Sequence, residues 1–240
     1  MGFEFETLNE GECLLCGAVG SLTGEHKIKA SLLKGEFGNR KMVMAGKDAP
    51  KVLQSPRSIH THFTVKICKE CNSSRTQAAD RAFDRLHQGL KKLRDEGRQL
   101  IDGNNHPNCK LSPRDSVDYF RYFAKVICCF LAEIGGPRSR SLSQFALGLN
   151  NRNPIFLWIS KDEQYEVHLA ELKTDGFAEH GGMKFRFDDK KKWVQSIESS
   201  LSVGGIRYEF WVQLGWLTRL ELHFNFGHLV REALANLEQD

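Results

Sequence analysis

The sequence has no apolar segment of the roughly 20 residues that a membrane-crossing helix requires. Its first ten residues, MGFEFETLNE, lack the basic and apolar regions of a secretory signal. It also lacks internal repeats and low-complexity segments, which argues against a solenoid or a disordered chain. Hydrophobic residues make up 40% and charged residues 27%, the balance of an ordinary globular protein. We therefore expect a cytoplasmic globular protein without membrane contact.

The sequence carries little net charge, +4 over 240 residues, so the whole-chain value identifies no partner. The charge is nevertheless unevenly distributed. Between Cys13 and Arg98 there are 17 Lys and Arg residues against 8 Asp and Glu residues, and the remainder is net acidic. A local basic excess is typical of a surface that binds a polyanion, although a solvated helix face has the same composition.

Seven cysteines are present, and four of them form two CxxC pairs, Cys13 with Cys16 and Cys68 with Cys71. Disulfides are disfavoured in the cytoplasm. One CxxC turn offers two thiolates, and two such turns complete a tetrahedral zinc site. We predict a closed structural Zn²⁺ site. The alternative is a redox-active pair, but two copies without a thioredoxin-like context argue against it.

A segment rich in Asn, Gly and Pro, residues 102–114, predicts a linker between an N-terminal domain, residues 1–101, and a C-terminal domain, residues 115–240. In the first domain we expect a strand near residues 21–28, a polar surface excursion over 34–58, a strand over 62–68 and a helix from about 79 to 96. Alternation in HFTVKIC indicates the second strand, and apolar residues at helical spacing indicate the helix. The predicted fold class is α+β.

The second domain is predicted to be α+β, with a long helix and an antiparallel sheet. The long helix begins at Asp115 and ends before Gly135. Shorter helices are expected over 141–148 and 228–238, and strands near 154–160, 164–170, 183–187, 206–214 and 218–225.

Five further residues of this domain carry no ligand spacing. Cys128 and Cys129 lie in an apolar part of the long helix and are expected to be buried and inert. Trp193, Trp211 and Trp216 are expected to be core or interface anchors, with stacking on nucleic-acid bases as the alternative.

A second candidate site depends on the first. If zinc holds both cysteine pairs, the strand that ends at Glu25 and His26 lies beside the helix that begins after Cys71. Glu25 and Asn72 can then offer hard oxygen ligands to a catalytic Mg²⁺ or Mn²⁺. His26, as a neutral imidazole, can accept a proton from an attacking water.

The segments CLLCG, GEHKIKASLL and ICKECNSSRTQAADRAFDRL resemble the HNH endonuclease superfamily, whose core is the ββα-metal fold. They are especially similar to the branch that carries a four-cysteine zinc site and includes endonuclease VII. The resemblance covers about residues 12–95. It implies that His26 is the general base and that Glu25 and Asn72 bind the catalytic metal. It also implies hydrolysis of DNA phosphodiester bonds to 5′-phosphate and 3′-hydroxyl ends, in settings such as phage defence or restriction; RNA stays open as a substrate.

Three positions depart from the family pattern or stay open. The acidic metal ligand is Glu, where Asp is commoner. The middle residue of the motif, usually Asn, is unassigned, and the nearest candidates are His60 and His62, with Asn39 farther away. Asp80 or Asp84 could replace the predicted amide as the last metal ligand.

Basic residues near the motif are candidates for substrate binding. Arg75 follows the predicted amide ligand by three residues, on nearly the same helix face, where a guanidinium could hold a phosphate. Lys27 and Lys69 are further candidates, followed by Lys29 and Arg81. Each could instead be a solvated charge or form a surface ion pair.

The C-terminal domain is expected to select the target, to form a homodimer or to bind a protein partner. The alternative to a nuclease is a non-catalytic zinc module that binds nucleic acid or a protein. Such a module would need the cysteines and the basic surface. It would not need Glu25, His26 and Asn72 to converge.

Overall fold

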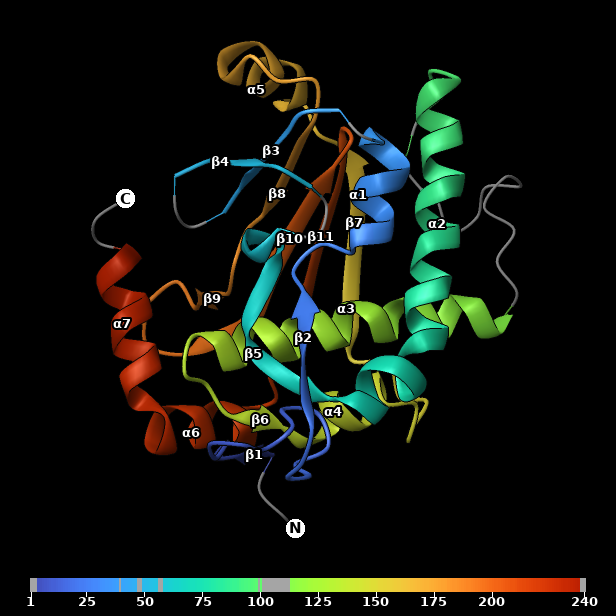
Figure 1. The fold of residues 1–240 in the computed structure, drawn as a ribbon. Coiled ribbons are helices and arrows are strands. Elements are labelled where there is room, and N and C mark those ends of the chain that lie inside the picture. The colour runs from blue at the N-terminus through green and yellow to red at the C-terminus, as the bar shows by residue number, and fades with distance from the viewer. Residues whose placement is uncertain are drawn as a thin grey trace.

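A computed structural model describes residues 4–38, 40–46, 49–55, 58–98, 100 and 113–237. Most of the predicted linker and the candidate Asn39 lie outside these residues. The fold is mixed α and β, in agreement with the predicted α+β class (Figure 1). None of the described helices is long and apolar enough to span a membrane.

The described helices are α1 Ala30–Phe37, α2 Gln77–Asp95, α3 Pro113–Glu133, α4 Arg140–Ala146, α5 Tyr165–Leu172, α6 Trp216–Asn225 and α7 Gly227–Leu237. A 3₁₀ turn, η1, spans Ile59–Thr61, and a π-helical turn, η2, spans Cys71–Arg75. The strands are β1 Phe5–Glu6, β2 Leu22–His26, β3 Met42–Ala45, β4 Lys51–Leu53, β5 His62–Cys68, β6 Arg138–Ser139, β7 Ile155–Lys161, β8 Phe177–His180, β9 Lys184–Phe187, β10 Val194–Val203 and β11 Ile206–Gln213.

The largest sheet crosses the predicted domain boundary. Its strand order is β4-β3-β8-β10-β11-β7, and β9 also pairs with β10. The strands β3 and β4 come from the predicted N-terminal domain, and β3 pairs in parallel with β8, with Val43 opposite Phe177. The other pairings in this sheet are antiparallel. Residues 102–114 therefore do not separate two independent sheets.

A single hydrophobic core joins the two halves of the chain. The helices α2 and α3 pack against each other and against one face of the large sheet. The ring of Phe83 in α2 stacks on Tyr122 in α3 with centroids 4.0 Å apart, and it meets Tyr208 in β11 edge-on at 5.3 Å. These rings are buried, and burial of such large apolar surfaces is the main stabilising term in folding.

A buried polar network also ties α1 to α2 and the sheet. Glu36 Oε1 lies 3.1 Å from His87 Nε2, and His87 Nδ1 lies 2.6 Å from the Tyr208 hydroxyl. Arg94 donates to Glu36 Oε2 at 3.1 Å. Burial opposes ionisation, but His87 and Arg94 together lower the pKa of Glu36 to about 2. The paired charge fixes α1 in place, because an unpaired buried carboxylate would be costly.

The strands β2 and β5 form a separate two-stranded antiparallel sheet in front of α3 (Figure 1). The alternating pattern over 62–68 predicted β5, and both bounds are confirmed. Leu22 lies opposite Cys68 and His26 opposite His62, with a bulge between Gly24 and His26. The turn η2 then leads from β5 into α2, so two strands and a helix follow one another around the cysteines.

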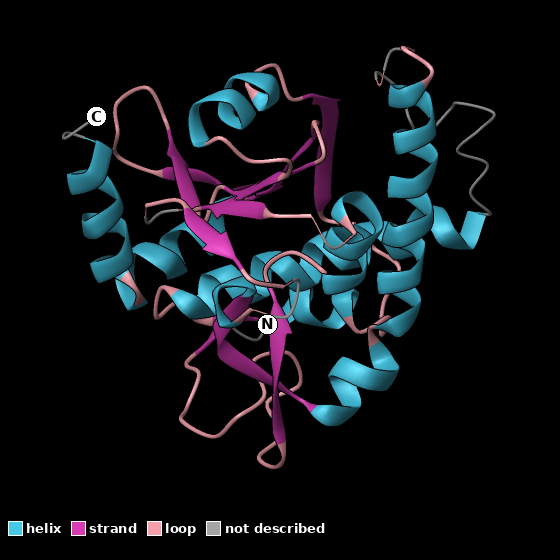
Figure 2. Ribbon diagram, turned by 45° about the horizontal axis from the view of Figure 1, so that its top comes forward, coloured by secondary structure: helices cyan, strands magenta, loops and turns pink. Residues whose placement is uncertain are grey.

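The strands predicted near 164–170 and 218–225 are wrong, because both segments are helical, as α5 and α6. Figure 2 shows both as helices at the periphery of the sheet. No residue of α5 is buried, and in α6 only Leu222 is. With so little burial, the apolar spacing of these segments does not reveal a helical period.

The polar surface excursion predicted over 34–58 is also wrong in part, since this segment contains the end of α1 and the strands β3 and β4, and β3 is largely buried. The strands β8 and β10 were not predicted. The segment VQSIESSLSV of β10 is rich in serine rather than in the β-branched and aromatic residues that mark a strand.

We predict that residues 1–101, expressed alone with Zn²⁺, do not fold cooperatively. Their strands β3 and β4 would lose β8, and the apolar face of α2 would be exposed to water. A thermal melt followed by circular dichroism and a ¹H–¹⁵N correlation spectrum would test this. A sharp transition with dispersed amide signals would contradict it.

Candidate metal centre and the adjoining hairpin

The first cysteine pair lies on a tight turn near the N-terminus. The Gly17 amide donates to the Cys13 carbonyl at 2.8 Å, and the Cys13 amide donates to the Ala18 carbonyl at 2.9 Å. Gly17 has a φ of 73°, in the left-handed region that glycine tolerates best. The sequence CLLCG therefore closes a turn that directs both thiols to one side.

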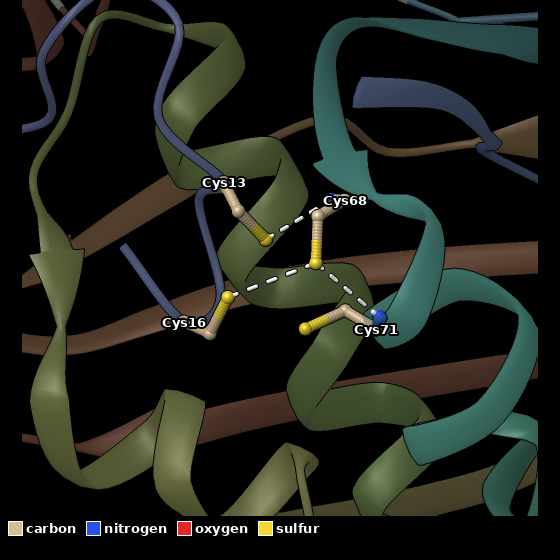
Figure 3. A group of neighbouring side chains, drawn as sticks. All are labelled: Cys13, Cys16, Cys68 and Cys71. Atoms are coloured by element: carbon tan, nitrogen blue, oxygen red, sulfur yellow. Dashed lines mark hydrogen bonds between the residues drawn. The ribbon is translucent and has the colours of Figure 1, made fainter. Parts of the chain in front are cut away.

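The second pair lies where β5 ends and η2 begins, so the two pairs come from segments that are far apart in the sequence. The four sulfur atoms of Cys13, Cys16, Cys68 and Cys71 all lie within 4.8 Å of one another and point toward a common centre (Figure 3). Cys16 Sγ and Cys68 Sγ are 3.7 Å apart. Four thiolates at roughly 2.3 Å from a tetrahedral zinc would be roughly 3.8 Å apart. The cluster can therefore hold a structural metal ion such as zinc.

Backbone amides surround these sulfur atoms. The Cys68 amide donates to Cys13 Sγ at 3.2 Å, and the Cys71 amide donates to Cys68 Sγ at 3.4 Å. A hydrogen bond from the Cys71 thiol lowers the pKa of Cys13 to about 4, with backbone amides adding to the effect and burial opposing it. The same bond raises the pKa of Cys71. The arrangement thus favours the thiolate of Cys13, the protonation state that binds a metal, whereas burial raises the pKa of Cys16.

Asn72 links the cysteine cluster to the two-stranded sheet of β2 and β5. Its side-chain Nδ2 donates to Thr23 Oγ1 at 3.0 Å and to the Gly24 carbonyl at 3.1 Å. The predicted amide ligand therefore lies against β2, immediately before Glu25. The amide oxygen, the atom that a cation would bind, takes part in neither bond.

Glu25 points into the protein and meets a lysine from α3. Its side chain is 6% exposed, and Lys125 Nζ lies 3.1 Å from Glu25 Oε1 and 2.6 Å from Asp80 Oδ1. Burial disfavours the charged amine, but the Asp80 and Glu25 carboxylates outweigh it and raise the pKa of Lys125. This ion triad joins β2, α2 and α3.

His26, the next residue along β2, packs against His62. Their ring centroids are 3.8 Å apart, with 41° between the planes. Both side chains are half-buried, whereas His60 is exposed on η1. Of the two candidates for the middle residue that the structure describes, His60 and His62, it is His62 that packs on the predicted base.

The basic candidates fall into two groups. Lys27 and Lys29 are held in ion pairs inside the structure, with Glu133 at 3.1 Å and Asp84 at 2.8 Å respectively. Arg75 and Lys69 are exposed, and Arg75 is paired with Glu70 at 2.8 Å. Arg75 and Lys69 are therefore the pair accessible to a substrate near Asn72.

Lys125 is the residue at this site that the sequence did not reveal. One signal was available: it is the only charged residue in the run FAKVICCFLA of α3. A lysine on a helix that is apolar on every side has to be buried with an acidic partner. The partners lie 100 and 45 residues away, so the signal points to a pair without identifying it.

Comparison of the chain with protein-family models, with curated proteins and with solved structures gives no match.

We predict that Cys71→Ser abolishes stoichiometric Zn²⁺ binding and lowers the melting temperature by at least about 10 °C, because the energy of binding a structural zinc is part of the folding energy. Metal analysis and thermal melting of the purified protein measure both effects. The matched control is Cys128→Ser, a buried cysteine outside the cluster, which should retain its zinc. Equal zinc content in the two variants would refute the assignment.

We also predict that Lys125→Met destabilises the protein by about 3–5 kcal/mol, because it leaves two carboxylates without their buried cation. Urea unfolding gives this value. Adding Glu25→Gln to the variant should recover part of the loss, since one of the uncompensated charges is then removed. A cost under about 1 kcal/mol for Lys125→Met would show that the triad does not hold the hairpin to α3.

Proposed function

We propose that the chain is a metal-dependent endonuclease of the HNH type that hydrolyses phosphodiester bonds of DNA. One observation carries the proposal: the Asn72 amide donates to the Gly24 carbonyl at 3.1 Å. The last residue of the motif CKECN thus adjoins the segment GEH, although the two are far apart in the sequence. The cysteine cluster by itself would bring Asn72 close to β2, so the support lies in which residues meet there: an amide beside a Glu–His pair.

In this proposal each residue of the motif has a separate task. His26 accepts a proton from the attacking water. Glu25 and Asn72 supply a carboxylate and an amide oxygen, the hard ligands that Mg²⁺ or Mn²⁺ prefers. When bound there, the cation supplies charge for the phosphate oxygen and for the leaving 3′ oxygen. His62, packed on the His26 ring, orients it.

The ion triad sets a condition on cation binding. Lys125 contacts Oε1 of Glu25, so that oxygen already faces a positive charge. A cation would use the other carboxylate oxygen, or Lys125 would have to move toward Asp80. In the first case the triad fixes the carboxylate, and a fixed ligand loses less entropy on binding.

Substrate contacts in this proposal lie on the exposed side of η2. Arg75 and Lys69 would hold phosphates near the cut, with Arg75 exchanging Glu70 for the phosphate. Lys27 would act by holding β2 to α3 through Glu133. A single site cuts one strand, so cutting both needs a dimer or two events. Phage defence and restriction are settings that suit such an enzyme.

The Lys125–Glu25 pair favours a second candidate, a non-catalytic zinc module that binds nucleic acid. If Lys125 permanently occupies the position of the cation, the motif is only structural. Such a protein would keep the cysteine cluster and the exposed basic residues, and it would cut nothing.

We predict that His26→Ala lowers the nicking rate of supercoiled plasmid with Mg²⁺ or Mn²⁺ by about 100-fold or more, the usual worth of a general base. Zinc content and melting should stay unchanged. The matched control is His60→Ala, an exposed histidine on η1, which should nick like the wild type. Unchanged nicking by His26→Ala would exclude the mechanism, and a wild-type protein that nicks nothing would favour the non-catalytic module.

A further inference from the structure

The large sheet has a second face, which we call the outer face, opposite to α2 and α3. Side chains alternate along β11, so Tyr208 and Phe210 point to the helices, while Arg207, Glu209 and Trp211 point outward. Over β7, β9, β10 and β11 the outer face is hollowed, with a volume of about 620 Å³. This is the size of a pocket for a substantial ligand.

Aromatic rings line this hollow and its edge. Trp158 and Phe156 of β7 are each 53% exposed. Phe156 lies directly opposite Trp211 in the register, and the two rings stack with centroids 5.6 Å apart and 12° between their planes. Trp211 itself is half-buried. Flat rings that stay at least partly exposed on a sheet are a surface on which unpaired bases can stack, whatever their sequence.

Charge on the outer face is neutralised at its centre and positive at one end. Glu198 is paired with Arg186 at 2.7 Å, and Glu209 with Arg207 at 3.3 Å. The turn between β9 and β10, next to Arg186, carries the exposed run Lys190–Lys192 directly after Asp188 and Asp189, so its net charge is +1 (three Lys against two Asp). Asp188 shapes this turn by accepting the backbone amides of the last lysine and of the following residue, at 2.7 and 3.0 Å. Aromatic rings beside a basic turn complement a chain of bases and phosphates.

We propose that the outer face binds single-stranded nucleic acid, with bases stacked on Trp158 and Trp211 and phosphates held by the turn Lys190–Lys192. The two tryptophans are diagonal neighbours on adjacent strands, as successive bases of an extended strand require. A duplex is a poor fit, because its bases are stacked on each other. The two-stranded sheet of β2 and β5 lies on the other side of α3, so the outer face would hold nucleic acid away from the proposed nuclease site. This binding rests on the proposed nuclease only for its biological role, because the outer face can bind nucleic acid whether or not the protein cuts it.

The test is fluorescence anisotropy of a labelled 20-nucleotide oligo-dT, and of a 20-base-pair duplex, with the full-length zinc-loaded protein and no added Mg²⁺ or Mn²⁺. The single strand should bind more tightly than the duplex. Trp158→Ala and Trp211→Ala should each weaken binding of the single strand by at least about fivefold. Replacing Lys190, Lys191 and Lys192 with Gln should weaken it further at low salt and flatten its salt dependence.

Two controls make the result specific. Trp216→Ala removes a tryptophan that is 68% exposed on α6, outside the hollow, and should bind like the wild type. Trp158→Phe keeps a ring for stacking and should lose less affinity than Trp158→Ala. This partial loss shows that the affinity of Trp158→Ala falls through the missing ring and not through misfolding. The proposal fails if the Trp158 and Trp211 variants bind as tightly as the wild type, or if Trp216→Ala weakens binding equally. It also fails if sedimentation shows a dimer that Trp158→Ala dissociates while oligo-dT binding is unchanged.

His26→Ala separates this inference from the proposed nuclease. It should bind oligo-dT with the wild-type affinity. If Trp158→Ala and Trp211→Ala bind normally while His26→Ala fails to nick, the outer-face proposal falls and the nuclease stands. If the wild-type protein does not nick plasmid but the two tryptophan variants lose affinity for oligo-dT, the nuclease proposal falls and the outer-face site stands.

Discussion

Four cysteine sulfur atoms from two segments of the chain meet at one point, although Cys16 and Cys68 are 52 residues apart in the sequence. Closing a loop of that length costs conformational entropy, and the pairing of β2 with β5 alone offers few hydrogen bonds in return. A metal ion bound by all four thiolates would supply the missing free energy. The contact of Asn72 with β2 then follows directly, because Asn72 is covalently next to Cys71. The geometry of the proposed catalytic motif thus depends on the cysteine cluster.

A second anchor comes from the other half of the chain. Lys125 reaches from α3 to Glu25 and Asp80, so the segment with the motif is completed by a helix beyond its own predicted boundary. Stacked rings in α2 and α3, and the pairing of β3 with β8, have the same effect. Strand β2 is therefore held from two sides, by sulfur at one end and by charge at the other. Such double support would keep the proposed proton acceptor and the proposed metal ligands in register.

The sequence predicted those features that depend on local pattern. Strict alternation predicted β5, and CxxC spacing predicted the cluster that the structure brings together. The features that it did not predict depend on distant partners. The strand β3 is short and its role is set by β8, whereas α5 and α6 are exposed helices whose apolar residues follow no clear period. The partners of Lys125 lie 100 and 45 residues away, beyond the range of any local rule. His62, a candidate from the sequence, is in contact with His26, but only the register of β2 and β5 shows it.

The position of Asn72 beside β2 depends on a metal ion bound by Cys13, Cys16, Cys68 and Cys71. Zinc K-edge X-ray absorption on the purified full-length protein tests this most directly. We expect one zinc per chain with a first shell of four sulfur atoms at roughly 2.3 Å. A protein without stoichiometric metal, or a shell dominated by nitrogen or oxygen, would contradict the account.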